Sequence, residues 1–354
     1  MSSNKHILLL TPGFAANEAD DSCIPALQVY LKTFREMFPD YKLSLIAFHY
    51  PFSAESYSWN GISVFPCNGR NKKWVKRLQT IRTAKSLFET IHKNEKVDLI
   101  HSFWLGECAK VGEELAKKMN IPHLNTLMGQ DVRDDNRFLR KSFLATLPEV
   151  TLSDRHAALF EKNAGRKPTS IIQWGIEDEK VELTNERNID ILAAGSLIEL
   201  KRYDLLLKTV AELKKDFPSI RVTIAGDGPQ RKSLEKLAAE LHVRNNIHFV
   251  GQVSRVAVLA LMKKGKLFFH PSSFESFGFV FAEARKCGMA IISTGVGIAK
   301  ESENWKIAND VKEMVVVAKY FLENKTDFSG EIIHSSKATA ESYEVLYRKM
   351  MKLD

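Results

Sequence analysis

The chain has 354 residues, 44% of them hydrophobic, and this length predicts two domains of ordinary size with full cores. No apolar run reaches the roughly 18 residues that a membrane helix needs, and the short apolar stretch within residues 1–10 has the wrong flanks for a signal peptide. The net charge of +8 indicates an anionic partner: a phosphorylated substrate, an acidic membrane surface or a nucleic acid.

The four cysteines, at positions 23, 67, 108 and 287, form no Cys-x-x-Cys pair. Their scatter argues against a zinc site and against a disulfide framework. We therefore expect the protein in the reducing cytoplasm. The basic residues lack interleaved aromatic residues or a recognisable module, which argues against a nucleic-acid partner.

Short apolar runs alternate with helical patterns along the whole chain, which predicts βαβ units, parallel sheets and an α/β fold. Strands are expected at residues 6–10, 43–48, 98–101, 123–127, 150–153 and 170–174, and again at 189–194, 221–225, 247–250, 267–270 and 290–293. A polar, charged stretch at residues 177–188 separates the two series and is the expected linker. We predict a first domain over residues 1–182 and a second over residues 188–336.

The first predicted strand leads to Gly13 and then to a helix that Pro25 opens. Strand, glycine loop and helix in this order are the outline of a phosphate-binding turn. One glycine is a weak signal for such a site, and the amides of residues 22–24 are further candidates for the same contact.

The densest chemistry lies in residues 271–288, a loop that follows a predicted buried strand and runs into a helix. Glu275 and Glu283 are eight residues apart, and Glu283 falls on a helix that is otherwise apolar nearly all round. A carboxylate there needs a partner, which is either the hydroxyl pair of a sugar or ribose or a base such as Arg285. The loop Ser276–Gly278 opens the helix, whose free amides and positive dipole favour an anion such as a diphosphate.

This stretch resembles the Glu-x7-Glu signature of glycosyltransferase family 4, a large family of retaining GT-B enzymes. Every position of the signature, Pro-Ser-x-x-Glu-x-Phe-Gly followed by Glu-Ala-x-x-x-Gly, is filled between Pro271 and Gly288. Residues 125–131, 194–204, 225–229, 249–253 and 295–301 also resemble family segments in order and spacing. The resemblance implies the GT-B fold, two Rossmann-like, doubly wound domains facing a central cleft, with a C-terminal helix at 337–354 returning to the first domain.

By this resemblance, a nucleotide-sugar donor such as a UDP- or GDP-sugar binds mainly to the second domain, and no cofactor is needed. Glu275 would contact the hydroxyls of the sugar, and Glu283 would hold the ribose. Lys201 would neutralise the diphosphate together with the amides of residues 276–278. Glu275 and Lys201 are the expected catalytic residues. The further donor contacts implied are Ser196, Gly226, Gly251, Gln252, Val253, Ser276, Phe277 and Gly278.

Two positions depart from the family pattern. Ser196 stands where the family has an arginine beside the diphosphate, and Met128 stands where it has a histidine facing the donor sugar. Loss of a fixed cation near the leaving diphosphate raises the barrier unless Arg202 or another base replaces it.

On the first domain, the resemblance implies an acceptor site lined by Gly13, His101, Gly129 and Asp131. His101 ends a predicted strand, so it points towards the cleft if the carboxyl end of the strand lies there. A structural role for His101 is an equally open interpretation. Asp131 belongs to an acidic cluster whose spacing is not that of a metal-binding Asp-x-Asp, and we interpret the cluster as part of a solvated loop.

The expected function is transfer of a sugar, with retention at the anomeric carbon and without a required metal, to a lipid-linked or cell-surface glycan. In residues 70–85, a helical wheel places Trp74, Leu78, Ile81 and Lys85 near one stripe, with Lys72, Lys73, Lys76 and Arg82 spread around it. Basic residues near an anionic membrane contribute about 1 kcal/mol each, so this segment could hold the protein on the inner face of the membrane. The alternative is an ordinary helix whose stripe packs on its own domain.

Two other classes of function stay open. A sugar-nucleotide epimerase can share the GT-B fold and would turn over the nucleotide-sugar without an acceptor. A catalytically weak nucleotide-sugar-binding subunit is the second, since Ser196 and Met128 replace residues that the family uses.

Overall fold

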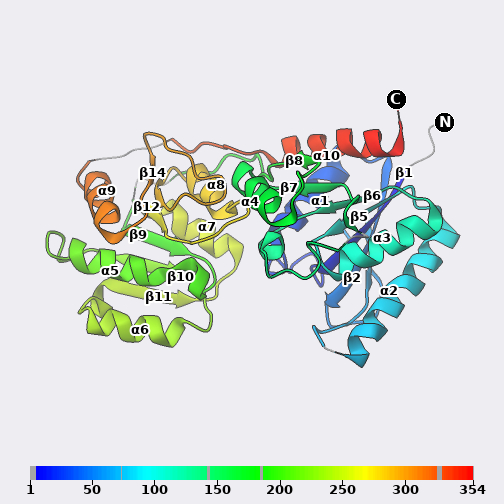
Figure 1. The fold of residues 1–354 in the computed structure, drawn as a ribbon. Helices are drawn as coiled ribbons and strands as arrows, with labels where there is room; N and C mark the ends of the chain where they lie inside the picture. Colours follow the sequence, from blue (N-terminus) through cyan, green and yellow to red (C-terminus); the bar gives the residue numbers. More distant parts are fainter. Residues whose placement is uncertain (1–4, 73, 142–143, 184–185, 325–328, 354) are drawn as a thin grey trace. The chain divides into compact units, whose positions relative to one another are not determined.

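The computed structural model describes residues 5–72, 74–141, 144–183, 186–324 and 329–353, and its ribbon is drawn in Figure 1. Contacts divide the chain into two compact units: unit 1 comprises residues 1–177 and 335–354, and unit 2 comprises residues 178–334. Residues 178–182, expected in the first domain, therefore fall in unit 2, where Val181 packs against a hydrophobic core.

Unit 1 contains an eight-stranded sheet in the order β3-β4-β2-β1-β5-β6-β7-β8. Its strands are β1 (Lys5–Gly13), β2 (Tyr41–Tyr50), β3 (Tyr57–Trp59), β4 (Ile62–Pro66), β5 (Leu99–Phe103), β6 (His123–Thr126), β7 (Glu149–Thr151) and β8 (Ser170–Ile171). All pairings are parallel except that of β3 with β4. Each strand expected from the sequence in this unit is present, although β8 is shorter than predicted, and the β3–β4 hairpin was not predicted.

The helices of unit 1 cover its sheet. They are α1 (Pro25–Met37), α2 (Val75–Asn94), α3 (Glu107–Met119), α4 (Asp154–Ala164) and α10 (Ser336–Met351). Helix α2 buries Ala84, Phe88 and Ile91 in a core shared with β1 and β2. Helix α10 returns to unit 1 and packs beside α1, where the hydroxyls of Tyr30 and Tyr347 lie 2.7 Å apart.

Unit 2 contains a six-stranded parallel sheet in the order β11-β10-β9-β12-β13-β14. Its strands are β9 (Ile189–Ala194), β10 (Val222–Ala225), β11 (Ile247–Gly251), β12 (Gly265–His270), β13 (Ala290–Ser293) and β14 (Trp305–Ile307). Its helices are α5 (Tyr203–Leu213), α6 (Arg231–Glu240), α7 (Arg255–Lys263), α8 (Phe279–Lys286) and α9 (Val311–Glu323).

The strand order of unit 2 reads 3-2-1-4-5-6 along the chain, which is the doubly wound Rossmann order. Separate apolar cores lie on the two faces of the sheet, because neighbouring strand residues such as Ile191 and Leu192 pack into different clusters. Strands buried on both faces read as continuous apolar runs, which explains why the sequence revealed them. The edge strand β14 was not predicted.

Candidate functional site

The strand order of unit 2 reverses between β9 and β12, and ligands of doubly wound sheets bind at the carboxyl ends of strands at such a point. Two loops begin there, residues 195–202 after β9 and residues 271–278 after β12. They are joined by hydrogen bonds: Ser273 N donates to Leu200 O at 2.8 Å, and Ser272 Oγ donates to the same oxygen at 3.3 Å. The two segments that the sequence singled out therefore form one surface.

An ion cluster of three side chains lies on this surface. Lys201 Nζ forms an ion pair with Glu275 Oε1, and His270 Nε2 lies 2.7 Å from the same oxygen. The side chains of Lys201 and Glu275 keep 18% and 14% of their surface exposed, whereas His270 is 2% exposed. The structure thus brings together the two residues predicted to be catalytic and adds a buried histidine.

The electrostatics of the cluster keep Glu275 ionised. Burial alone would raise the pKa of Glu275, but the hydrogen bond from His270 and the charge of Lys201 outweigh burial and lower the pKa to about 2. Burial lowers the pKa of His270, although Glu275 opposes this shift. A carboxylate, a cation and a neutral imidazole therefore lie together at the carboxyl ends of the central strands of unit 2.

Glycine backbone lines the neighbouring turns. Gly226, at the end of β10, has φ 140°, and a Cβ there would lie 1.9 Å from Gly195 O. Gly195 N donates to Ala225 O at 2.9 Å, and Gly226 N donates to Gly251 O at 2.8 Å. The ends of β9, β10 and β11 thus meet backbone to backbone, which is the close packing that a glycine at position 226 permits.

Helix α8 begins beside the cluster. Its first turn follows Gly278, whose φ of 91° favours glycine, and a Cβ at this position would lie 2.5 Å from the Phe281 ring. Phe277 is completely buried, and its carbonyl accepts a hydrogen bond from Ile298 N at 3.0 Å. Ser276 is half-buried between these residues and Glu275. The loop is thus held from the side of residues 294–298 as well as from Leu200.

Glu283 lies on α8, 6% exposed, and its Oε1 accepts from Arg255 Nε at 2.7 Å. Arg285, one base considered from the sequence, instead pairs with Glu331. Helix α7 begins at Arg255 directly after the loop Gly251–Val253, in which Gln252 is exposed and the other two residues are half-buried. The pairing therefore ties Glu283 to the start of the helix that follows Gly251–Val253, three of the donor contacts implied by the resemblance.

The position that departs from the family pattern in this unit is open to solvent. Ser196 is exposed, and the guanidinium of Arg202 is directed to Asp204, with Nε 3.3 Å from Oδ1. Lys201 is therefore the cation that the structure brings to Glu275, and Arg202 does not take the place of the missing arginine in this arrangement.

In unit 1, His101 does not line a surface, and the prediction that it does is corrected. It is completely buried on β5, with Nδ1 2.6 Å from Tyr347 Oη and Nε2 2.8 Å from Thr126 Oγ1. Burial lowers the pKa of His101 well below its usual value. Its role is structural, the second of the two interpretations that the sequence left open.

The remaining acceptor candidates lie at the carboxyl ends of β1 and β6. Asp131 accepts hydrogen bonds from the amides of Leu105, Met128 and Gly129, so it fixes the loop rather than pointing into solvent. An added Cβ at Gly129 would meet no described atom within 4 Å, which leaves its backbone open on that side. Gly13 is buried.

Asp20 holds the loop after Gly13 in place through hydrogen bonds. Ser22 N donates to Asp20 Oδ1 at 3.1 Å, and Tyr50 Oη donates to Asp20 Oδ2 at 2.8 Å. The Ser22 amide, one of those considered for an anion, is therefore already engaged by a carboxylate.

Sequence reasoning missed two sets of residues. His270 was seen only as the last residue of a buried strand; its signal is that a histidine ends the strand and Glu275 follows five positions later. The second set is His49, Arg77 and Glu107. Arg77 pairs with Glu107, and His49 Nε2 lies 3.7 Å from Glu107 Oε2. These three come from β2, α2 and α3, so no local spacing could reveal them.

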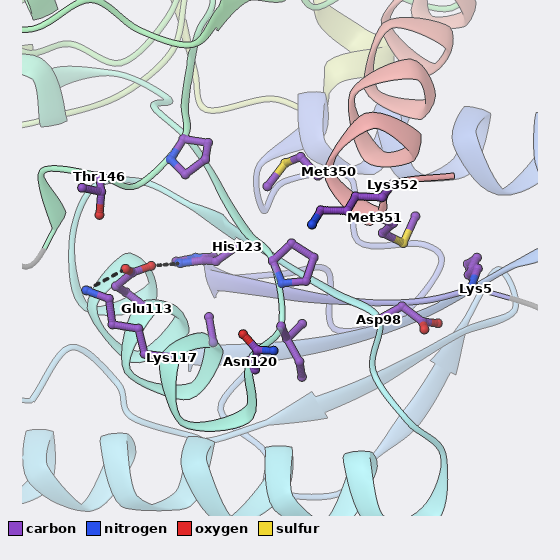
Figure 2. A pocket seen from close by; sticks show the side chains of 14 residues that line it. Lys5, Asp98, Glu113, Lys117, Asn120, His123, Thr146, Met350, Met351 and Lys352 are labelled. Carbon is purple, nitrogen blue, oxygen red and sulfur yellow. Dashed lines mark hydrogen bonds and ion pairs between the residues drawn. The ribbon is translucent and has the colours of Figure 1, made fainter. Parts of the chain in front are cut away.

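A hollow of about 570 Å³ opens at the amino ends of the strands in the sheet of unit 1 (Figure 2). It is lined at the amino ends of β1, β5 and β6 by Lys5, Asp98 and His123, and Figure 2 shows Glu113 between His123 and Lys117. Both ring nitrogens of His123 are engaged, by Glu113 at 3.0 Å and by Ser102 Oγ at 2.8 Å. Because it lies at the amino ends of the strands, this hollow is separate from the acceptor candidates at the carboxyl ends of β1 and β6.

Within the described residues, no helix is long and apolar enough to cross a lipid bilayer. The same residues contain no group of three or more histidine, cysteine or acidic side chains arranged to hold a metal ion.

Comparisons with known proteins address the family. Residues 176–329 match the model of the family described as Glycosyl transferases group 1. The gpi3 subunit of phosphatidylinositol N-acetylglucosaminyltransferase from Schizosaccharomyces pombe is 34% identical over 141 residues, which are 40% of this chain and 31% of that protein. The matched stretch thus spans less than a third of that relative.

Solved structures address the fold. Sucrose-phosphate synthase from Thermosynechococcus elongatus is similar with a TM-score of 0.79 at 16% identity, covering 99% of this chain and 100% of that chain. Anabaena HepE, in complex with UDP and glucose, is similar with a TM-score of 0.67 at 16% identity, with 98% of each chain covered. Identities this low establish the fold alone. They show that the chain has the GT-B fold, and the family match shows that residues 176–329 are similar to the group 1 glycosyltransferases.

Proposed function

We propose that the chain is a retaining, metal-independent glycosyltransferase that moves a sugar from a nucleotide-sugar to a glycan acceptor. The observation that carries the proposal is the cluster of Lys201, Glu275 and His270 at the switch point of unit 2. The cation would bind the diphosphate of the donor, and the adjacent carboxylate would bind the hydroxyls of its sugar.

Each part of the donor has a partner in this arrangement. Departure of a nucleoside diphosphate develops negative charge, which Lys201 and the amides at the start of α8 would stabilise. Glu275 would accept hydrogen bonds from the hydroxyls of the sugar. Glu283, beside the loop Gly251–Val253, would bind the ribose while it keeps Arg255 as a partner. The complex of HepE with UDP and glucose supports a UDP-sugar as the first donor to test.

The acceptor is proposed to be a lipid-linked or cell-surface glycan at an anionic membrane. Trp74 is 84% exposed, Val75 77% and Leu78 57%, so this turn does not pack on its own domain, and α2 instead buries Ala84 and Phe88. The exposure of Trp74 and Leu78 supports the interfacial interpretation, whereas Ile81, the third apolar member of the stripe, packs against the core of unit 1. The protein would then be cytoplasmic and peripheral on the membrane.

The basic residues of the segment lie around the exposed turn. Lys72, Lys76 and Arg82 are exposed, and Arg70 lies with its guanidinium 5.2 Å from the ring centroid of the exposed Phe52. Lys73, another of the basic residues expected there, lies outside the described residues. Aromatic and aliphatic side chains among cations are the composition that binds the headgroup region of an anionic bilayer.

A screen of nucleotide-sugars and nucleoside diphosphates for thermal stabilisation tests the donor proposal, because a ligand of the native state raises its melting temperature. The stabilising donor is then assayed for transfer, with and without a chelator, and the anomeric configuration of the product is read by NMR. Stabilisation by no nucleotide-sugar would overturn the donor assignment. Inversion, or loss of activity with the chelator, would overturn the mechanism alone.

The absence of an arginine at position 196 favours one alternative, a subunit that binds a nucleotide-sugar but transfers it poorly. The exposed Ser196 leaves Lys201 to neutralise the diphosphate with backbone amides. Binding without transfer to any acceptor would support that alternative. Turnover of the donor with no acceptor present would instead indicate an epimerase.

A further inference from the structure

The two carboxylate oxygens of Glu275 have different surroundings. His270 Nε2 and Lys201 Nζ both contact Oε1. Among the residues that the structure describes, no hydrogen bond reaches Oε2, and the side chain keeps 14% of its surface exposed. One oxygen is therefore anchored in the protein and the other is available to a ligand.

The two donors on Oε1 differ in how firmly they are held. His270 ends β12 and is 2% exposed. Its ring lies parallel to Phe268, with centroids 5.9 Å apart, and edge-on to Phe281, with centroids 5.0 Å apart. Burial and the two ring contacts hold the imidazole in place at the end of the strand.

The side chain of Lys201 is less firmly held than that of His270. Its ammonium is a point charge on a flexible four-carbon stem, with 18% of the side chain exposed. The function proposed above requires the same ammonium to neutralise the diphosphate. A bound diphosphate therefore competes with Glu275 for Lys201.

We propose that His270 is a positioning residue, which anchors Oε1 of Glu275 and presents Oε2 to the hydroxyls of the donor sugar when Lys201 turns to the diphosphate. This inference rests on the proposed function. It also fixes the tautomer of His270, because a neutral imidazole has one N–H and a carboxylate can only accept: the proton is on Nε2.

The role predicts which part of donor binding depends on His270. A nucleoside diphosphate carries no sugar and meets Lys201 and backbone amides, so its affinity is independent of His270. The extra affinity of the complete nucleotide-sugar, and the turnover number, depend on a correctly held Glu275. A merely structural histidine would affect both ligands alike.

The test uses two substitutions of His270 and a matched control. His270→Phe keeps a ring between Phe268 and Phe281 but removes the N–H, and His270→Gln restores an N–H near the position of Nε2. His248→Phe makes the same change at an exposed position of β11. For each protein, the dissociation constants of UDP and of the stabilising UDP-sugar and the turnover number are measured; if the screen selects a GDP-sugar, GDP and that sugar are used.

In His270→Phe, we expect the dissociation constant of the UDP-sugar to rise about tenfold relative to that of UDP, and the turnover number to fall about tenfold. A change of this size is what loss of a hydrogen bond to a charged group causes. The affinity for UDP should stay within about twofold, and His270→Gln should recover most of the loss. Equal values in His270→Phe and wild type, or an equal loss in folded His270→Gln, would overturn the inference.

A measurement on the unmodified protein covers the case in which His270→Phe does not fold. The ¹⁵N chemical shifts of the imidazole report its tautomer. A proton on Nδ1 and none on Nε2 at neutral pH would overturn the inference without any variant. Failure of the proposed function looks different: the wild type itself would then bind neither UDP nor a nucleotide-sugar.

Discussion

Arg255 Nε donates to Glu283 Oε1 at 2.7 Å, and this bond ties the first residue of α7 to the middle of α8. The pair is largely buried, with side-chain exposures of 21% and 8%. Removing one member of such a pair is destabilising, because it takes a hydrogen-bonded counter-charge away from a largely buried group. A variant of Glu283 therefore reports on ligand binding only if its stability is measured as well.

Glu283→Ala should weaken binding of the free nucleoside diphosphate by about 1.5 to 3 kcal/mol if Glu283 makes charge-assisted bonds to the ribose. Calorimetric titration of the diphosphate gives the affinity, and thermal unfolding gives the stability. Glu212→Ala, which breaks an exposed pair with Lys215, is the control. A folded variant with unchanged affinity would contradict the ribose contact and assign Glu283 a structural role.

Glu275→Ala and Lys201→Ala should each lower turnover at least about tenfold, which corresponds to roughly 1.4 kcal/mol of transition-state stabilisation. In Glu275→Ala the sugar loses its acceptor of hydrogen bonds, and in Lys201→Ala the diphosphate loses its cation. Initial rates at saturating donor measure the effect. Lys208→Ala is the matched control, because Lys208 pairs with Asp204 on the exposed face of α5. Near-normal rates in both site variants would remove the catalytic assignment.

The ionisation of Glu275 should appear in the stability of the protein at acid pH. Its pKa is about 2, against 4.5 for an unperturbed glutamate, so the unfolded chain binds the proton more tightly than the folded one. The contribution of this carboxylate is therefore complete above about pH 4.5 and is lost as the pH falls towards about 2, with an upper limit of about 3 kcal/mol. Urea unfolding at several pH values should show a steeper decline for the wild type than for Glu275→Gln. Parallel declines would contradict the assigned ionisation.

Trp74→Ala should reduce binding to anionic vesicles, because the indole is exposed and would enter the headgroup region. Co-sedimentation with anionic and neutral vesicles, at low and high salt, measures the effect. Tyr320→Ala removes an exposed aromatic ring from α9 in unit 2 and should change nothing. If the wild type does not bind anionic vesicles at low salt, the acceptor is a soluble molecule.

Gly226→Ala should destabilise the protein strongly, since the added Cβ would lie 1.9 Å from the Gly195 carbonyl oxygen and the backbone has φ 140°. Gly106→Ala is the control, because an added Cβ there meets no described atom within 4 Å and its φ is −153°. Thermal unfolding of the two variants should separate them by several kelvin. Equal melting temperatures would show that the turn can relax.

The apolar runs predicted parallel sheets and an α/β fold, because strands buried on both faces are continuous apolar runs. The doubly wound arrangement was implied by the family resemblance. The β3–β4 hairpin was missed although its turn is visible as Asn60-Gly61, with φ 45° and 77°, between Trp59 and Ile62. Asn-Gly between apolar residues is a strong short-range hairpin signal. The strand β14 has three residues, and its place at the edge comes from pairing with β13, which no local pattern encodes.

From residue spacing alone, the candidate site was predictable only where the motif is local, and Lys201 was expected there through the family resemblance. Glu275 and the start of α8 lie within one stretch, and their relation follows from spacing. The contact of Glu275 with Lys201 spans 74 positions, and that of Arg255 with Glu283 spans 28. Such pairs are set by the order of strands in the sheet. The burial of His101 likewise depends on α10, which lies more than two hundred residues away along the chain.

The return of α10 to unit 1 has a consequence for the order in which the protein can be made. Tyr343 Oη lies 2.9 Å from Trp174 Nε1 and 2.8 Å from Thr126 Oγ1, and Tyr347 Oη lies 2.6 Å from His101 Nδ1. Domains generally fold as units during synthesis, the N-terminal one first. Here unit 1 lacks two buried tyrosines until α10 emerges after unit 2, so unit 2 can complete its core before unit 1 does.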